Sequence, residues 1–329
     1  MKKALFIVLI ASFVSCTAFA ITISNSSIEL TIHEQNGRFS LYAIDTNGGK
    51  TALFVEDDPR TTLLTVLAGS KIYRMGDSFE FRQSVEGEGT TASITWSSSS
   101  LRITEKFTLE GSTLSISITV NNVSERDLKI GIRYLLDTYL GEKTGHFTAD
   151  GIQVENETDY VWATPYEIIS SDEKNTQLVI ATTGNKISEP DRIVLANWKR
   201  LNDTTWDFEA NQNRDFNQLP YSINDSAVAL YYEPQTVPSK TNRAVTLLFK
   251  WEDPSTVIPT SGTAGAEQSG ENKELRDDIK AETIKIDSLI IRIDSLISSE
   301  DTPSESDIEE VTSLMKELEE RKEELTGQQ

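Results

Sequence analysis

The chain has 329 residues, a formal net charge of −21 at neutral pH and a hydrophobic content of 37%. This length has room for one large or two modest domains. Because so acidic a surface repels phosphate backbones and anionic lipid headgroups, the charge excludes nucleic acid as a partner and leaves membrane-surface binding to a separate anchor.

The first 20 residues have the pattern of a cleaved secretory signal peptide. Lys2 and Lys3 are basic, residues 4–14 form an uncharged apolar run, and residues 18–20 have the small-x-small spacing of a signal-peptidase site. The run is shorter than the roughly 20 apolar residues that span a bilayer. We therefore expect a periplasmic or secreted protein whose mature chain starts at Ile21.

Cys16 keeps a second mode of export open. Residues 13–16 form a loose lipobox, so a lipoprotein anchored through Cys16 is the alternative to cleavage after Ala20. Cys16 is the one cysteine of the chain, and cleavage after Ala20 removes it. The mature fold would then be held by its hydrophobic core without disulfides.

Residues 21–253 alternate apolar and polar side chains with the period of β-strands. Asn36-Gly37 is a strong hairpin signal, and Gly111 separates two further alternating runs at residues 103–109 and 114–120. Phe79 and Phe81 have the same alternation and are assigned to another strand. Strands at short, regular spacing predict a large antiparallel β-sandwich, and no segment of this region indicates a helix clearly.

The composition changes at Pro254. Residues 254–272 are rich in Pro, Ser, Thr, Gly and Ala and predict a flexible linker. Residues 273–329 are acidic and place apolar residues at the a and d positions of heptads, with a helix-starting motif at residues 302–305. The predicted tail is a coiled-coil-like α-helical hairpin.

The first tail helix has more isoleucines than a single seam between two helices requires. Ile290 and Ile297 fall at e positions, and Ile284 and Ile291 fall at f positions, on the far side of the helix. We therefore predict that these side chains bind a partner, which would be a second copy, the β domain or another cell-envelope protein. The alternative is a solvated spacer.

The loop that follows the strand at residues 128–136 contains the acids of a candidate site. Asp137, Glu142 and Asp150 could ligate a hard cation such as calcium or act as a carboxylate pair, and His146 lies among them. The spacing fits no EF-hand, so no cofactor is expected and calcium is the alternative. In the structural interpretation, Asp137 only caps a long loop.

Two tryptophans are candidates for sugar binding. Trp198 is followed by two basic residues and Trp206 lies nearby, and an aromatic face beside polar groups can stack on a sugar ring. The structural alternative is that both rings fill the core or its rim.

The run of residues 27–32 followed by residues 36–41 resembles the first hairpin of galactose-mutarotase-like supersandwich domains. The resemblance implies a large two-sheet β domain of a kind that often binds or processes carbohydrate. It supplies no functional residue, because the His and Glu pattern of mutarotases is not visible. Our main expectation is an exported, non-catalytic binding or structural protein of the cell envelope, whose helical tail mediates assembly. The alternative is a carbohydrate-active or carbohydrate-binding protein of supersandwich type, with a glycan as its partner.

Overall fold

The computed structural model describes residues 20–54, 62–142, 146–161, 164–171, 176–221 and 225–252. This part of the chain is mainly β, as the alternation predicts. Its elements are, in chain order, β1 (Ala20–Ser24), β2 (Ile28–His33), β3 (Arg38–Ile44), β4 (Lys50–Ala52), β5 (Leu63–Ala68), β6 (Lys71–Arg74), β7 (Arg82–Glu88), β8 (Thr91–Ser97), β9 (Leu101–Glu110), β10 (Thr113–Asn122), β11 (Leu128–Asp137), β12 (Phe147–Ala149), β13 (Ile152–Val154), β14 (Thr158–Tyr160), β15 (Glu167–Ser171), β16 (Gln177–Ala181), β17 (Arg192–Asn197), α1 (Trp198–Asp203), β18 (Ser226–Val237) and β19 (Asn242–Glu252).

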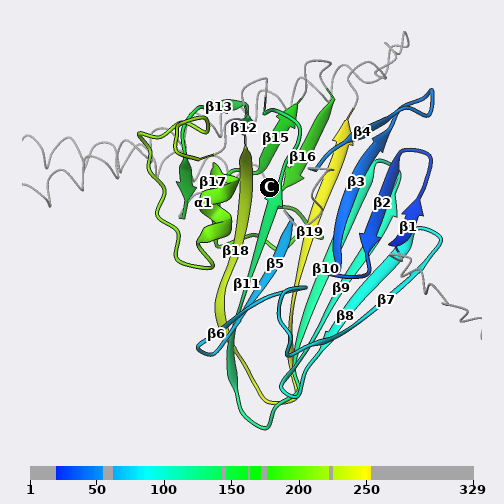
Figure 1. Ribbon diagram of the computed structural model, residues 1–329, viewed down its shortest axis with the longest axis vertical. Helices are drawn as coiled ribbons and strands as arrows, with labels where there is room; N and C mark the ends of the chain where they lie inside the picture. The colour runs from blue at the N-terminus through cyan, green and yellow to red at the C-terminus, as the bar shows by residue number, and fades with distance from the viewer. Residues whose placement is uncertain are drawn as a thin grey trace, which may run out of the picture. The chain divides into compact units, whose positions relative to one another are not determined.

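The strands form antiparallel sheets of four, nine and six strands (Figure 1). The four-stranded sheet has the order β1-β2-β3-β4, and the six-stranded sheet has the order β14-β17-β18-β11-β5-β6. The nine-stranded sheet has the order β13-β12-β15-β16-β19-β10-β9-β8-β7. The predicted antiparallel β-sandwich is confirmed at this level.

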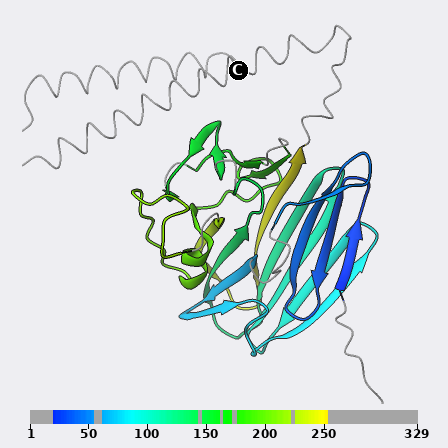
Figure 2. The same cartoon turned by 45° about the horizontal axis from the view of Figure 1, so that its top comes forward.

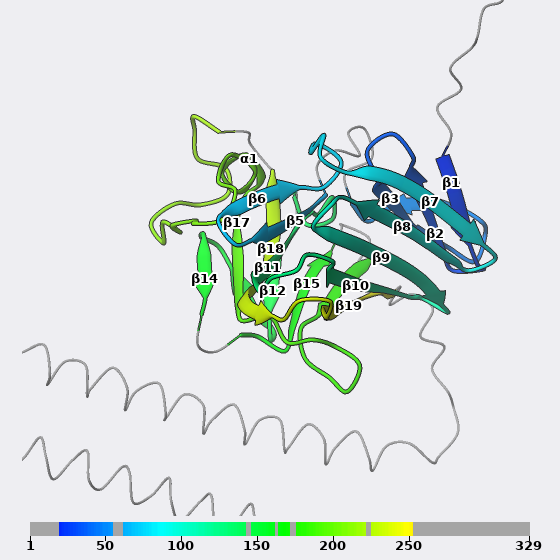
Figure 3. The same ribbon diagram turned by 90° about the horizontal axis from the view of Figure 1, so that it is seen from below.

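The four-stranded and six-stranded sheets both pack on one face of the nine-stranded sheet. Phe107 of β9 contacts Phe39 of β3 with ring centroids 5.2 Å apart, while Glu105, on the same face of β9, bonds to Tyr134 of β11. An isolated antiparallel bridge joins Phe54, which follows β4, to Thr138, which follows β11, so the two smaller sheets are connected at this point. The result is a sandwich of two layers, visible in the turned views of Figures 2 and 3.

The core lies between these layers because the strands alternate. Every second residue of β9 and β10 is buried, and the residues between them face outward. Two hairpins have the turns that the sequence indicates, since Gly37 and Gly111 both have positive φ (70° and 56°). A fully buried Ile or Leu stabilises the fold by about 1.5–3 kcal/mol, which makes this alternation the main determinant of the sandwich.

The structure differs from the sequence-based prediction at two places. Phe79 lies in the turn that precedes β7, and Phe81 precedes the first residue of β7, so neither is in a strand, because the chain reverses after β6 at Gly76 (φ 88°). The short helix α1 was not predicted. Asn197 caps it by accepting from the backbone N–H of Lys199 (3.0 Å) and of Arg200 (3.4 Å).

The signal peptide, the linker and the tail fall mostly or wholly outside the described residues. This holds for Cys16, for the predicted helical hairpin and for the isoleucines assigned to partner binding, which are Ile284, Ile290, Ile291 and Ile297. Among the residues that are described, no helix is long and apolar enough to cross a membrane.

Candidate functional site

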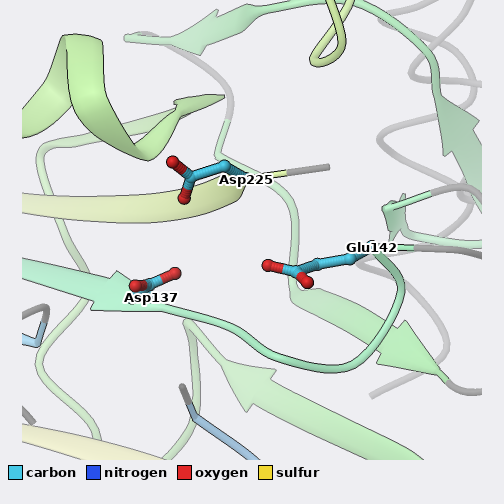
Figure 4. Close-up of side chains that lie close together, drawn as sticks. All are labelled: Asp137, Glu142 and Asp225. Atoms are coloured by element: carbon cyan, nitrogen blue, oxygen red, sulfur yellow. The ribbon is translucent and has the colours of Figure 1, made fainter. Parts of the chain in front are cut away.

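Three carboxylates meet at one end of the six-stranded sheet. One oxygen of each of Asp137, Glu142 and Asp225 lies within 4.8 Å of the others (Figure 4). Asp137 is buried, and the other two are half-buried. Three negative charges at this separation repel one another, so the arrangement favours a cation, a shared proton or a hydrogen-bond donor between them.

Strand pairing brings Asp137 and Asp225 together. Asp137 is the last residue of β11 and pairs with Ala227 of β18, and Asp225 directly precedes β18. The hydroxyl of Thr138 donates to the carbonyl oxygen of Ser226 at 3.3 Å, which ties the two chain segments together just beyond the strand pair. The carboxylates of two distant segments are therefore held side by side by the ladder of the sheet.

Glu142 reaches the group through a tight turn at Gly141. Gly141 has a φ of 87°, and a Cβ atom at this position would lie 2.2 Å from the carbonyl oxygen of His146. The carbonyl oxygen of Gly141 accepts from the backbone N–H of His146 at 2.6 Å. The hydroxyl of Ser170 in β15 donates to the carbonyl oxygen of Leu140. The close approach of these backbones requires a glycine here.

His146 is half-buried and lies close to the start of β18. Its Nδ1 is 3.0 Å from the hydroxyl oxygen of Ser226, and its ring packs on Phe216 with centroids 4.7 Å apart. Burial lowers the pKa of His146, and the negative charge of Asp215 opposes this shift in part. The imidazole is therefore neutral at neutral pH, with one nitrogen able to accept a proton.

Asp150, the third acid expected in the site, lies elsewhere. It occupies the turn between β12 and β13, and its Oδ1 accepts from the backbone N–H of Tyr166 (2.8 Å) and of Glu167 (3.2 Å). The carboxylate thus holds the start of β15 to this turn. Asp225 takes the place of Asp150 beside Asp137 and Glu142.

The two tryptophans have different surroundings. The backbone N–H of Trp198, at the start of α1, donates to the carbonyl oxygen of Asp225 at 2.8 Å, and its side chain is half-buried. Trp206 is only 8% exposed, packs edge-to-face on Tyr231 and lies against Gly131 of β11. The backbone of Trp198 therefore lies next to that of Asp225, while its side chain packs against the hydrophobic cluster that includes Leu135 and Leu201. The ring of Trp206 fills the space beside β11.

Sequence reasoning missed Asp225 and two exposed tyrosines. Asp225 is far from Asp137 in the chain, and only the pairing of β11 with β18 brings them together. Tyr139, in the loop between Asp137 and Glu142, and Tyr166, before β15, are both exposed. The exposure of a large aromatic side chain would have indicated these two tyrosines as ligand-contacting candidates. A loop has no regular alternation of apolar and polar residues, so the sequence does not show which of its side chains are exposed.

The carboxylates could act in three ways. Carboxylate oxygens are the ligands that hard cations such as calcium prefer, and Asp137, Glu142 and Asp225 would be the residues to hold one. A buried carboxyl beside two half-buried ones also provides the unequal environments that general acid–base chemistry uses. Hydroxyl groups of a polar ligand could donate to the same oxygens.

No family model and no curated protein matches this sequence. Solved structures similar to the chain include a putative aldose 1-epimerase from Escherichia coli, with 10% identity, 71% of this chain and 99% of that chain covered, and a TM-score of 0.48. An aldose epimerase homologue from C. elegans has 10% identity, the same coverage and a TM-score of 0.45. A galactose mutarotase-like protein from Lactobacillus casei has 15% identity, with 71% of this chain and 100% of that chain covered and a TM-score of 0.35.

The resemblance to galactose-mutarotase-like domains, which the sequence of residues 27–41 suggests, is confirmed by this comparison. The main functional expectation is contradicted by it. A non-catalytic binding or structural protein of the cell envelope was expected, whereas the similar structures are described as aldose epimerases and mutarotase-like proteins.

Proposed function

We propose that this protein is a carbohydrate-active or carbohydrate-binding protein of supersandwich type, and that its sugar site is the group of Asp137, Glu142 and Asp225. The observation that carries the proposal is the convergence of these three carboxylates within 4.8 Å at the end of β11. The substrate class is the one that the supersandwich resemblance implies.

The chemistry of the group suits a sugar. The hydroxyls of a saccharide are donors in fixed positions, and carboxylate oxygens accept from them. His146, neutral because burial lowers its pKa, can accept or donate a proton next to Ser226. Proton transfer to and from sugar oxygens by carboxylates or an imidazole is the reaction type that this set of residues supports.

Two aromatic residues lie near the carboxylates along the backbone. Tyr139 is 47% exposed in the loop between Asp137 and Glu142, and Trp198 is half-buried next to Asp225. Flat aromatic rings with a polar edge suit a ligand with one apolar and one hydroxylated face. We therefore propose that Tyr139 and Trp198 contact the sugar. Trp206, the other candidate from the sequence, is buried and is not part of the proposed site.

The test is a binding titration of the mature full chain with a panel of mono- and oligosaccharides. We expect Asp137→Asn and Asp225→Asn to weaken the binding of the sugars that the wild type binds by tenfold or more, since each removes an acceptor charge. Glu86→Gln, on the exposed face of the edge strand β7, is the matched control and should bind as the wild type does. Equal affinity in all four proteins would exclude the carboxylates as the site.

We propose in addition that the protein is exported, with cleavage after Ala20. The support is the succession of basic residues, apolar run and small-x-small motif in residues 1–20. N-terminal sequencing of the protein from its native cells should start at Ile21. A lipid-modified Cys16 at the start would replace this proposal with that of a lipoprotein.

A further inference from the structure

A groove lies at the opposite end of β11 from the carboxylates. Leu128, the first residue of β11, lines it, whereas Asp137, the last, belongs to the carboxylate group. Nine residues of strand separate the two positions, which corresponds to about 30 Å at roughly 3.3 Å per residue. The groove has a volume of about 590 Å³, within the range of roughly 300–1,000 Å³ that is usual for small-molecule sites.

Three turns build the groove from both layers of the sandwich. They are the β5–β6 turn at Gly69 and Ser70, the β8–β9 turn at Ser99 and Ser100, and the turn between β10 and β11. The turns are joined by backbone bonds, since the N–H of Val123 donates to the carbonyl of Ser100 at 3.0 Å and the N–H of Gly69 donates to that of Lys129 at 2.8 Å. The walls are therefore fixed in advance of any ligand.

Asn122 holds the third turn in place. Its side chain is buried, and its Nδ2 donates to the carbonyl oxygens of Arg126 (2.8 Å) and Val237 (3.0 Å). Its Oδ1 accepts from the hydroxyl of Ser124 at 2.6 Å. Asp127 accepts from the backbone N–H of Ser239 at 3.0 Å. These bonds fix the backbone of the turn that contains Arg126.

The groove presents hydrogen-bonding groups that the protein does not use. The hydroxyls of Ser70, Ser99 and Ser100 and the guanidinium of Arg126 bond to no other described side chain or backbone group, although all four residues line the groove. A hydroxyl can donate and accept, and a guanidinium donates through several N–H groups. A ligand that satisfies them must offer several oxygens that both donate and accept.

The charges of the lining cancel. Lys71 and Arg126 are positive, and Glu80 and Asp127 are negative, so two positive and two negative side chains give no net charge. Lys71 already pairs with Glu80 at 3.2 Å. This balance gives no strong attraction for an anion or a cation and suits a neutral ligand.

An exposed aromatic residue precedes one of the lining residues in the chain. Phe79 directly precedes the lining residue Glu80 and is fully exposed, which is rare for a phenylalanine. An exposed aromatic ring gives an apolar surface on which one face of a sugar ring can lie.

We propose that this groove, lined by Ser70, Ser99, Ser100 and Arg126, binds a neutral saccharide as a second site, separate from the carboxylate group, and that Phe79, which precedes the lining residue Glu80 in the chain, contributes to the binding. The ligand class follows from the unused hydroxyls and the cancelled charge, and it does not depend on the function proposed for Asp137, Glu142 and Asp225.

The experiment titrates the mature full chain with the neutral trisaccharides maltotriose, cellotriose and mannotriose in a calorimeter. Arg126→Ala and the double variant Ser99→Leu/Ser100→Leu should weaken groove binding by tenfold or more, and Phe79→Ala should weaken it several-fold. Ser84→Leu, on an exposed position of β7, is the control and should bind as the wild type does. Trigalacturonate is the charged probe and should bind less tightly than the neutral trisaccharides.

Comparing the groove variants with the carboxylate variant distinguishes binding in the groove from binding at the carboxylates. Binding that is lost in Ser99→Leu/Ser100→Leu but kept in Asp137→Asn supports the groove. Binding that is lost in Asp137→Asn alone, or no binding of any trisaccharide, overturns it. Tighter binding of trigalacturonate than of the neutral probes would overturn the assignment of a neutral ligand.

Discussion

Tyr134 of β11 donates a hydrogen bond to the carboxyl group of Glu105 of β9, across the interface between the two layers of the sandwich. Both side chains are buried. Burial raises the pKa of Glu105 from its ordinary 4.5 to about 8, although the hydrogen bond from Tyr134 opposes the shift. Glu105 is therefore protonated in the folded protein at neutral pH.

This buried carboxyl makes stability depend on pH. The folded state keeps the proton of Glu105 up to about pH 8, while the unfolded state loses it near pH 4.5. The unfolded state binds fewer protons across this window, so the free energy of unfolding falls as the pH rises. The contribution of Glu105 is complete below about pH 4.5 and is lost by about pH 8, a change of about 5 kcal/mol at 1.36 kcal/mol per pKa unit.

Glu105→Gln should remove this part of the pH dependence, because the amide does not ionise. Chemical denaturation at a series of pH values from 4 to 9 would measure it, and the variant should gain stability relative to the wild type as the pH rises. Tyr134→Phe is the control, since it removes the hydrogen bond but leaves the carboxyl buried, and its decline with pH should persist. Parallel curves for wild type and Glu105→Gln would show that Glu105 is ionised in the folded state.

The turn at Gly141 offers a test of how Glu142 is positioned. Gly141→Ala would place a Cβ 2.2 Å from the carbonyl oxygen of His146, whereas Gly111→Ala, at a similar positive φ, has nothing within 4 Å. Gly111→Ala should cost about 1 kcal/mol of unfolding free energy from backbone strain alone. Gly141→Ala should cost at least about 2 kcal/mol more, because the backbones must move apart. Equal losses in urea denaturation would mean that the loop adapts freely.

Much of the β fold follows from the sequence, because it depends on local alternation and turn residues. The hairpins at Gly37 and Gly111 are examples in which the period of two and a glycine with positive φ are both local properties. Phe79 shows the limit of this reasoning, since two phenylalanines two residues apart occur in a turn as well as in a strand.

The candidate site depends on long-range pairing, which one sequence does not reveal. Asp137 and Glu142 are close in the chain and could be proposed together. Asp225 joins them only through the register of β11 with β18, while Asp150 is drawn away by its bonds to the start of β15. Composition and the alternation of apolar and polar residues predict where strands are. They do not predict the order of strands in a sheet, and so they do not predict which distant strands pair.

The two tryptophans should respond to substitution in opposite ways. Trp206→Ala empties a buried space beside Gly131 and Tyr231 and should lower the unfolding free energy by about 3–5 kcal/mol without affecting sugar affinity per folded molecule. Trp198→Ala should destabilise the protein less and weaken sugar binding. Thermal unfolding and saccharide titration of both variants would measure this. If Trp206→Ala weakened sugar affinity and Trp198→Ala did not, the assignment of the two rings would be reversed.

Calcium should leave the stability of the protein unchanged. The ion takes six to eight oxygen ligands, and three carboxylates converge here. Melting curves with chelator and with excess calcium would test this statement. A rise of several degrees with calcium that Asp225→Asn abolishes would identify a metal site instead.

The most direct test of the central claim is a crystal structure of the full mature chain with a saccharide selected from the binding panel. If the carboxylates form the sugar site, hydroxyls of the bound sugar will lie within hydrogen-bonding distance of at least two of Asp137, Glu142 and Asp225, with a ring next to Tyr139 or Trp198. A saccharide that binds the protein in the crystal but leaves these three carboxylates untouched would contradict the claim.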